Sequence, residues 1–288
     1  MKNRLMSSMF GFVVFAFSTV VLAQTAQAQA IPRTTDGKPD LSGTWFGGGR
    51  TTGGQAAGQF GPTGTIELTK WGRDKFNWNR APVAANAPGV YGGQVVRVDQ
   101  DPLYHCYPAG LVRLGPPRYI ITGGSGARPA LIEILQTPSK VILLFNYQHE
   151  VRYIYTDGRE HPKNLELTWN GHSIGRWDGD ALVVDTIGIR DESWLDTGGH
   201  EHSTQLRVVE RFRRVDAETL EIERTLTDPV ALAKPFTTTV SLKLSPDGDI
   251  DENINGVYDC TQFMMRKPAF GEGVNTLLGI SEPPAGGY

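Results

Sequence analysis

The chain has no excess of positive charge and, after its first thirty residues, no second long apolar run. Its formal net charge is −3, and removing residues 1–30, which hold two cations and no acids, changes this to −5. A negative balance argues against nucleic acid or an anionic membrane surface as a partner. Because no later run is long enough to cross a bilayer, we expect no membrane insertion of the mature chain.

Residues 1–30 have the features of a signal peptide. Lys2 and Arg4 give a positive start, an apolar stretch covers residues 9–22, and Ala-x-Ala cleavage sites end at Ala28 and Ala30. A membrane anchor is the alternative, but the apolar stretch is shorter than the roughly 20 residues of a bilayer span. We therefore expect cleavage and a periplasmic or secreted protein.

Cysteine is scarce, and the two that occur are Cys106 and Cys260. In an oxidising compartment an isolated pair most simply forms one disulfide. A reactive thiol is the alternative, and it lacks a supporting motif nearby. We predict a Cys106–Cys260 disulfide.

The short motifs of several enzyme classes are missing too. There is no His-Glu-x-x-His zinc motif and no Gly-x-Ser-x-Gly nucleophile elbow. The glycine-rich stretch 123–126 lacks the strand–turn–helix setting of a nucleotide-binding loop, so we interpret it as a flexible turn. We therefore expect chemistry without a cofactor.

What the chain does contain is a series of short apolar and β-branched runs separated by turn residues. Asp178-Gly179, for example, is a strong signal for a two-residue hairpin. Such strands usually form antiparallel meanders, and closing the meander into a barrel removes its exposed edges. We therefore predict an all-β, antiparallel, lipocalin-like barrel. The expected strands lie at residues 131–135, 141–145, 151–155, 173–177, 180–186, 206–213, 220–227, 236–244 and 250–258.

We expect one domain, because no linker-like break divides the mature chain. Residues 31–130 are rich in glycine and proline, and they predict a loop-rich N-terminal arm with a first strand near 41–46 and a short helix at 66–79. The main barrel should cover residues 131–268, and residues 269–288 should form an extended tail.

Two sets of residues resemble known proteins. The stretch from Asp40 to Trp45 contains a Gly-x-Trp sequence that resembles the opening of lipocalin-type barrels, whose tryptophan plugs one barrel end. The second resemblance is to a large group of exported bacterial proteins of undefined function. It implies export and a shared fold, and it implies no mechanism. The residues that carry it are 155–162, 169–180, 184–186, 194–196, 202–203 and 210–211.

Strand alternation brings His172 and Asp185 together. A turn at Asp178-Gly179 would set Trp177 opposite Asp180 and, counting back, His172 opposite Asp185. The β-carbons of opposed residues lie about 5 Å apart, so the carboxylate could fix the tautomer of the ring and raise its basicity. That arrangement suits a general base. A purely structural pair that holds the hairpin together is the alternative, and both remain open.

Glu210 and Arg224 form a second expected pair. Each shares its strand face with apolar residues, and any sensible register of their hairpin makes them opposite or diagonal neighbours. An isolated buried charge is costly, so the two should pair inside the protein. They are either a structural device or, with Arg152, part of a polar pocket that binds a ligand.

The chain has six histidines, and three of them lie in the motifs above. His161, His172 and His202 could supply three nitrogen ligands to zinc, with Asp185 behind them. The chain lacks the spacing typical of a zinc site, however, so we favour pocket histidines without metal. Trp169 is either a core residue or the floor of an apolar pocket.

These residues favour an exported enzyme that applies cofactor-free acid–base chemistry to a small apolar or aromatic molecule in the barrel cavity. His172 would be the base, Asp185 would orient it, and His202 would be a second acid–base group. Polar ends of the substrate would bind to the other ionisable residues. The reaction would be that of a lyase, isomerase, cyclase or hydrolase. A carrier or sensor that binds a small molecule without changing it, and a structural envelope protein, are the alternatives. The binding residues in this hypothesis are Arg152, His161, Glu210 and Arg224.

Overall fold

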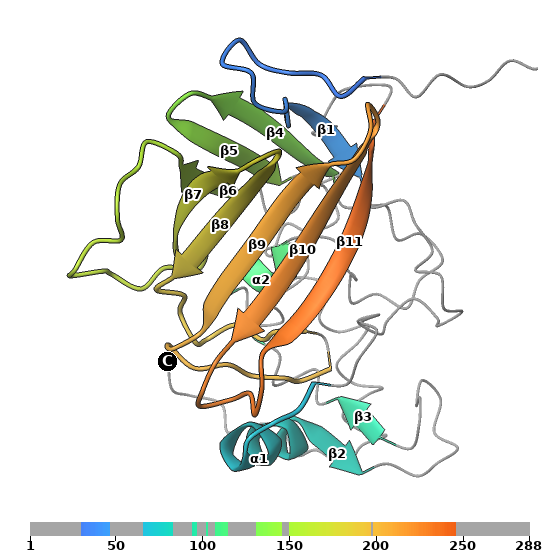
Figure 1. The fold of residues 1–288 in the computed structure, drawn as a ribbon. Helices are drawn as coiled ribbons and strands as arrows, with labels where there is room; N and C mark the ends of the chain where they lie inside the picture. Colours follow the sequence, from blue (N-terminus) through green and yellow to red (C-terminus); the bar gives the residue numbers. More distant parts are fainter. Residues whose placement is uncertain are drawn as a thin grey trace, which may run out of the picture.

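The computed structural model describes residues 30–46, 66–82, 94–96, 102, 107–114, 131–145, 150–196 and 198–245. Nine strands of this part form a closed barrel in the order β1-β11-β10-β9-β8-β7-β6-β5-β4 (Figure 1). The barrel strands are β1 (Gly43–Phe46), β4 (Leu131–Thr137), β5 (Lys140–Phe145), β6 (Val151–Tyr155), β7 (His172–Asp178), β8 (Ala181–Ile187), β9 (Arg207–Arg214), β10 (Thr219–Thr227) and β11 (Phe236–Leu244).

The remaining elements are not strands of the barrel wall. The strands β2 (Arg80–Pro82) and β3 (Gln94–Val96) pair with each other, and the helices are α1 (Lys70–Trp78) and α2 (Leu111–Leu114). The predicted helix at 66–79 corresponds to α1, which begins after Thr69, whose side chain accepts a hydrogen bond from the Gly72 amide. No helix of the described residues is long and apolar enough to span a membrane.

The predicted lipocalin-like barrel is confirmed, with one difference in strand direction. All neighbouring strands are antiparallel except β6 and β7, which run parallel. The cause is the connection between them: residues 156–171 fold back so that β7 begins beside the last residues of β6, where Ser173 pairs with Ile154, and runs in the same direction. The predicted strand at 250–258, the tail at 269–288, the signal peptide and both cysteines lie outside the described residues, so those expectations stay predictions.

Trp45 belongs to the larger apolar cluster inside the barrel. Its side chain is fully buried, and its ring nitrogen donates a hydrogen bond to the Leu41 carbonyl at 2.9 Å. The Arg214 guanidinium lies 5.1 Å from the centre of the Trp45 ring, within range of a cation–π contact. Trp45 is therefore a core residue of the barrel, and its role as a plug of one end stays a prediction from the Gly-x-Trp sequence.

A polar layer divides the barrel interior into two apolar parts. Along β9 the inward side chains are Val208, Glu210 and Phe212; Val208 belongs to one apolar cluster and Phe212 to the other. Along β10, Arg224 likewise lies between Leu226 and Ile222 of the same two clusters. The inward side chains on either side of this layer are buried in these two clusters.

Candidate functional site

His172 and Asp185 lie on the outer face of the barrel, and their expected register is wrong. His172 pairs with Ile187, and Asp185 pairs with Ile174. The two-residue loop of the hairpin is Gly179-Asp180, one position later than expected, with Gly179 at φ 58°. This shift moves His172 and Asp185 from direct opposition to a diagonal on the same outer face. The expectation that they line the barrel cavity is therefore wrong as well.

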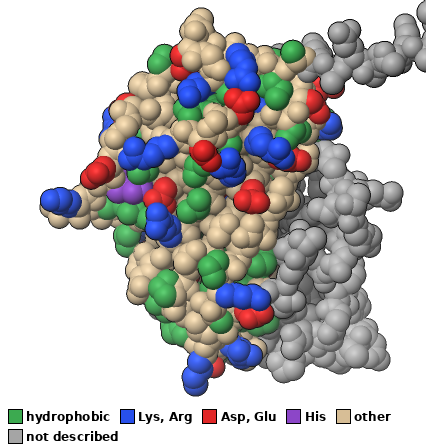
Figure 2. All heavy atoms as spheres, viewed as in Figure 1, with side chains coloured by type: hydrophobic (Ala, Val, Ile, Leu, Met, Phe, Trp, Pro, Cys, Tyr) green, Lys and Arg blue, Asp and Glu red, His purple; other side chains and the backbone are tan. Residues whose placement is uncertain are grey.

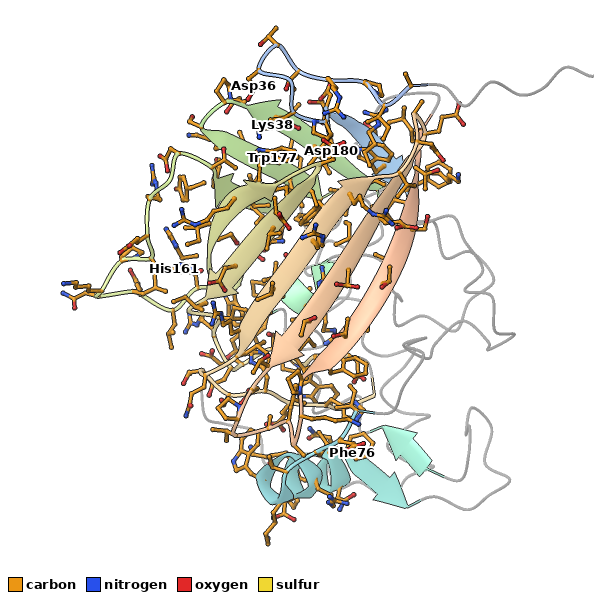
Figure 3. All side chains as sticks on the ribbon, in the orientation of Figure 1. Asp36, Lys38, Phe76, His161, Trp177 and Asp180 are labelled. Atoms are coloured by element: carbon orange, nitrogen blue, oxygen red, sulfur yellow. The ribbon has the colours of Figure 1, made fainter. Side chains whose placement is uncertain are left out.

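The connection 156–171 covers this part of the outer wall and supplies His161. Leu165 packs against Gly188, where an added Cβ would lie 2.4 Å from a Leu165 methyl carbon. His161 then lies between the two diagonal residues. Its Nδ1 is 2.9 Å from His172 Nδ1, and its Nε2 is 3.5 Å from Asp185 Oδ2. Figure 3 shows His161, which belongs to this connection, beside the outer wall.

The charges around the two rings assign their protons. The Asp185 carboxylate favours a proton on the facing His161 Nε2, which is buried and has no hydrogen-bond partner among the described residues. With that proton in place, neutral His161 presents an unprotonated Nδ1, which accepts from His172 Nδ1–H. His172 Nε2 is then the nitrogen with a free lone pair. The row Asp185–His161–His172 thus ends in a base.

The electrostatic environment keeps this base neutral at pH 7. Burial is the main cause that lowers the pKa of His172 from its ordinary value, and its electrostatic interactions with His161 and Arg159 lower it further. Burial alone would raise the pKa of Asp185, but the hydrogen bonds and charge of Arg207, with a smaller part from His161, hold it below the usual range. Arg207 Nε and Nη2 bind the two Asp185 oxygens at 2.7 and 2.8 Å. Asp185 is therefore ionised and fixed in place.

Aromatic and cationic side chains surround the end of this row. The Tyr155 ring stacks on His172 with centroids 5.5 Å apart and an interplanar angle of 25°. Arg159 lies over the Tyr155 ring at 3.9 Å and forms an ion pair with Asp157 at 2.5 Å. The His172 ring is therefore bordered by an aromatic ring and a nearby cation.

The second predicted pair is confirmed and is part of a larger cluster inside the barrel. Glu210 and Arg224 are direct cross-strand partners, and Arg224 Nη2 lies 2.8 Å from Glu210 Oε1. Arg152 binds the other carboxylate oxygen of Glu210 at 2.5 Å, and its guanidinium also donates to Ser173 Oγ and Thr186 Oγ1. Burial would raise the pKa of Glu210, but Arg152 and Arg224 lower it to about 2.

The remaining candidates lie in other parts of the molecule. His202 makes its hydrogen bonds to Ser193 and Ser203. Half-buried Trp169 contacts Tyr107, with centroids 5.6 Å apart, and Arg190, whose guanidinium is 4.9 Å from the ring. The described residues contain no group of three or more His, Cys, Asp or Glu side chains able to hold a metal ion. His161 Nε2 faces Asp185, and both ring nitrogens of His202 bond to serines in another part of the molecule. The three histidines therefore do not meet at one point, as a zinc site would require.

No protein-family model, curated protein or solved structure matches this chain. The resemblance to exported bacterial proteins therefore stays a prediction, and function has to be argued from the geometry.

Sequence reasoning missed the intermediate role of His161 and did not include Arg207. Alternation alone could have placed Arg207 on the outer face of β9, the face that Asp185 shares on β8. The place of His161 has no such signal, because it depends on how residues 156–171 fold back over the wall.

Proposed function

We propose that the protein is an exported enzyme that removes a proton from a small, largely apolar or aromatic molecule, with His172 Nε2 as the general base. The observation that carries this proposal is the contact between the two Nδ1 atoms, 2.9 Å apart, with Asp185 on the far side of His161. It gives the rings a preferred proton arrangement and leaves one basic nitrogen without a hydrogen bond to the described residues.

The proton path follows from the same arrangement. When His172 Nε2 accepts a proton, its ring becomes cationic, and the Nδ1–H bond to His161 strengthens. The Asp185 carboxylate, 3.5 Å from His161 Nε2, stabilises that charge from the far side of His161. Asp185 and His161 are thus positioning residues, and only His172 would touch the substrate.

The surface beside His172 supports an apolar substrate. On the outer faces of β4, β5 and β6, Leu135, Ile142 and Tyr153 are cross-strand neighbours. Leu135 is 41% exposed and Tyr153 is 49% exposed. Tyr155 follows Tyr153 by two residues on the same face of β6. The Tyr155 ring in turn stacks on His172. Exposed apolar groups of this kind can hold a ligand beside the base.

A proton-abstraction probe tests the proposal without knowledge of the natural substrate. 5-Nitrobenzisoxazole is a planar aromatic compound; when a base removes its ring C–H proton, the N–O bond breaks and a coloured cyanophenolate forms. We expect the purified chain to accelerate this reaction and His172→Gln to lower the rate at least about 100-fold, the usual contribution of a positioned base. The rate should rise with pH through a pKa below the ordinary value of histidine.

His200→Gln is the matched control. His200 is also a histidine bonded to an aspartate, since its Nδ1 lies 2.6 Å from Asp196 Oδ2, but it belongs to a different part of the molecule. This variant should keep the wild-type rate. Equal rates for the wild type and His172→Gln, both folded by circular dichroism, would overturn the assignment.

A further inference from the structure

A second, independent arrangement lies in the loop between β8 and β9, where Ser193 and His202 face each other. Trp194 and Glu201 form an isolated antiparallel bridge, and the Leu195 amide donates to the His200 carbonyl. Ser193 and His202 are the next residues outward on either side of that bridge. Local backbone pairing therefore brings their side chains together, with Ser193 Oγ 3.1 Å from His202 Nε2.

The other ring nitrogen of His202 fixes the direction of this hydrogen bond. His202 Nδ1 lies 3.0 Å from the Ser203 carbonyl oxygen, which can only accept, so Nδ1 carries the proton of the neutral ring. His202 Nε2 is then unprotonated and accepts from the Ser193 hydroxyl. Burial lowers the pKa of His202, against weaker opposing effects of the Ser203 carbonyl and nearby carboxylates, so the neutral form is favoured at pH 7.

Asp228 holds the supporting carbonyl in place. Its carboxylate accepts from the Ser203 amide at 2.6 Å and from the Ser203 hydroxyl at 2.9 Å. The same carboxylate accepts from the amides of Val230 and Ala231. Ser203 is therefore fixed at its amide and side chain, and its carbonyl stays directed at His202.

The backbone of Gly110 packs closely against Ser193. A Cβ added to Gly110 would lie 2.6 Å from Ser193 Oγ, and Gly110 has φ 74°, so no other residue fits without strain. The same Cβ position lies 3.5 Å from the Trp169 carbonyl oxygen. Trp169 and its neighbour Tyr107, which is 45% exposed, reach the surface next to this point. Ser193 is 4% exposed and His202 is 1% exposed, so a substrate has to displace neighbouring side chains to reach the hydroxyl.

We propose that Ser193 is a nucleophile for acyl transfer, activated by His202, and that it takes esters with an aromatic or apolar acyl group. Ser193 Oγ attacks the ester carbonyl carbon while His202 Nε2 takes the hydroxyl proton. The tetrahedral intermediate collapses, the ester C–O bond breaks, and His202 returns that proton to the leaving alkoxide. Water then attacks the acyl-serine by the same steps in reverse, releases the acid and restores the serine.

This inference does not depend on the His172 base, and an active-site label tests it directly. A fluorophosphonate reacts with an activated serine by losing fluoride, and the proton of the hydroxyl leaves through His202 to solvent. We expect one adduct on the folded full-length chain, located at Ser193 by tandem mass spectrometry. His202→Gln should label at least about 100-fold more slowly, because the general base is gone.

Ser241→Ala is the matched control, because it removes a serine hydroxyl from an exposed position on β11. It should retain the label, whereas Ser193→Ala should lose it. His172→Gln should label at the wild-type rate, which separates this site from the proposed base. Absence of an adduct on the folded wild type, or an adduct that persists in Ser193→Ala, would overturn the proposal; circular dichroism melts confirm that each variant is folded.

Discussion

The two polar clusters of the β7–β8 hairpin lie on opposite sides of one barrel wall, only one residue apart in the sequence. Ser173 and Thr186 point inward and bind Arg152, which pairs with Glu210. Their neighbours His172 and Asp185 point outward and are connected through His161. The same alternation of strand residues thus produces a sealed cluster and a partly open one.

The difference lies in what remains available to a ligand. Inside, Glu210 and Arg152 are almost completely buried, and both Glu210 oxygens face an arginine. Outside, the Asp185 side chain is 24% exposed and the His161 side chain is 14% exposed. A fully paired, buried cluster stabilises the wall, whereas a half-buried row that ends in a free lone pair suits chemistry.

The surface of β8 to β11 carries mixed charges of both signs, without one dominant patch (Figure 2).

The largest effect should follow from removing the central charge of the inner cluster. Glu210→Gln leaves Arg152 and Arg224 buried without their partner, and breaking a buried ion pair on one side costs about 3–5 kcal/mol of unfolding free energy. Urea denaturation measures it. Glu221→Gln is the control, because Glu221 pairs with Arg213 at a largely exposed site, and it should cost less than about 1 kcal/mol. Equal losses would mean that the inner cluster is not the structural one.

The pH dependence of stability should separate the clusters next. Glu210 has a folded pKa of about 2, below its ordinary 4.5, so its contribution is complete above pH 4.5 and is lost as pH falls toward 2. His172 also has a lowered pKa, from an ordinary 6.5, so its smaller contribution is complete above that value and declines below it.

Urea unfolding at a series of pH values checks both windows. Part of the acid loss between pH 4.5 and 2 should be absent in Glu210→Gln, and the small change just below pH 6.5 should be absent in His172→Gln. A Glu210→Gln curve parallel to the wild-type curve in acid would show that Glu210 does not titrate in this window.

Sequence reasoning succeeded where apolar neighbours determine the face of a residue. Val208 and Phe212 flank Glu210 on β9, and buried residues flank Arg224 on β10, so only one face could be inward. That pairing did not need exact registers. The position of Arg152 was harder, because Val151 and Tyr153 are as apolar as its inward neighbour Ile154.

Reasoning failed where one residue of register or one long connection decides the geometry. Asp178, Gly179 and Asp180 allow a tight turn at either of two positions, and a shift by one changes every cross-strand partner. The parallel pairing of β6 and β7 has no local signal either, since an apolar run does not show its direction. His161 reaches its place only because both features occur together.

The smallest effect should come from adjacent positions on β8, and it is the sharpest test of the comparison. Thr186→Val keeps the shape of the side chain but removes a hydroxyl that binds Arg152 and Ser173 inside the barrel, so it should cost about 1–2 kcal/mol of unfolding free energy. Asp185→Asn, one residue earlier, should cost less than about 1 kcal/mol, because its ion pair with Arg207 is partly exposed. The order should reverse for proton abstraction from 5-nitrobenzisoxazole. Asp185→Asn should slow it and shift its pH profile to lower values, since His172 loses the charge that supports its protonated form, while Thr186→Val should leave rate and profile unchanged. If Thr186→Val slows the reaction as much as Asp185→Asn does, the two faces of the wall do not divide structure from chemistry.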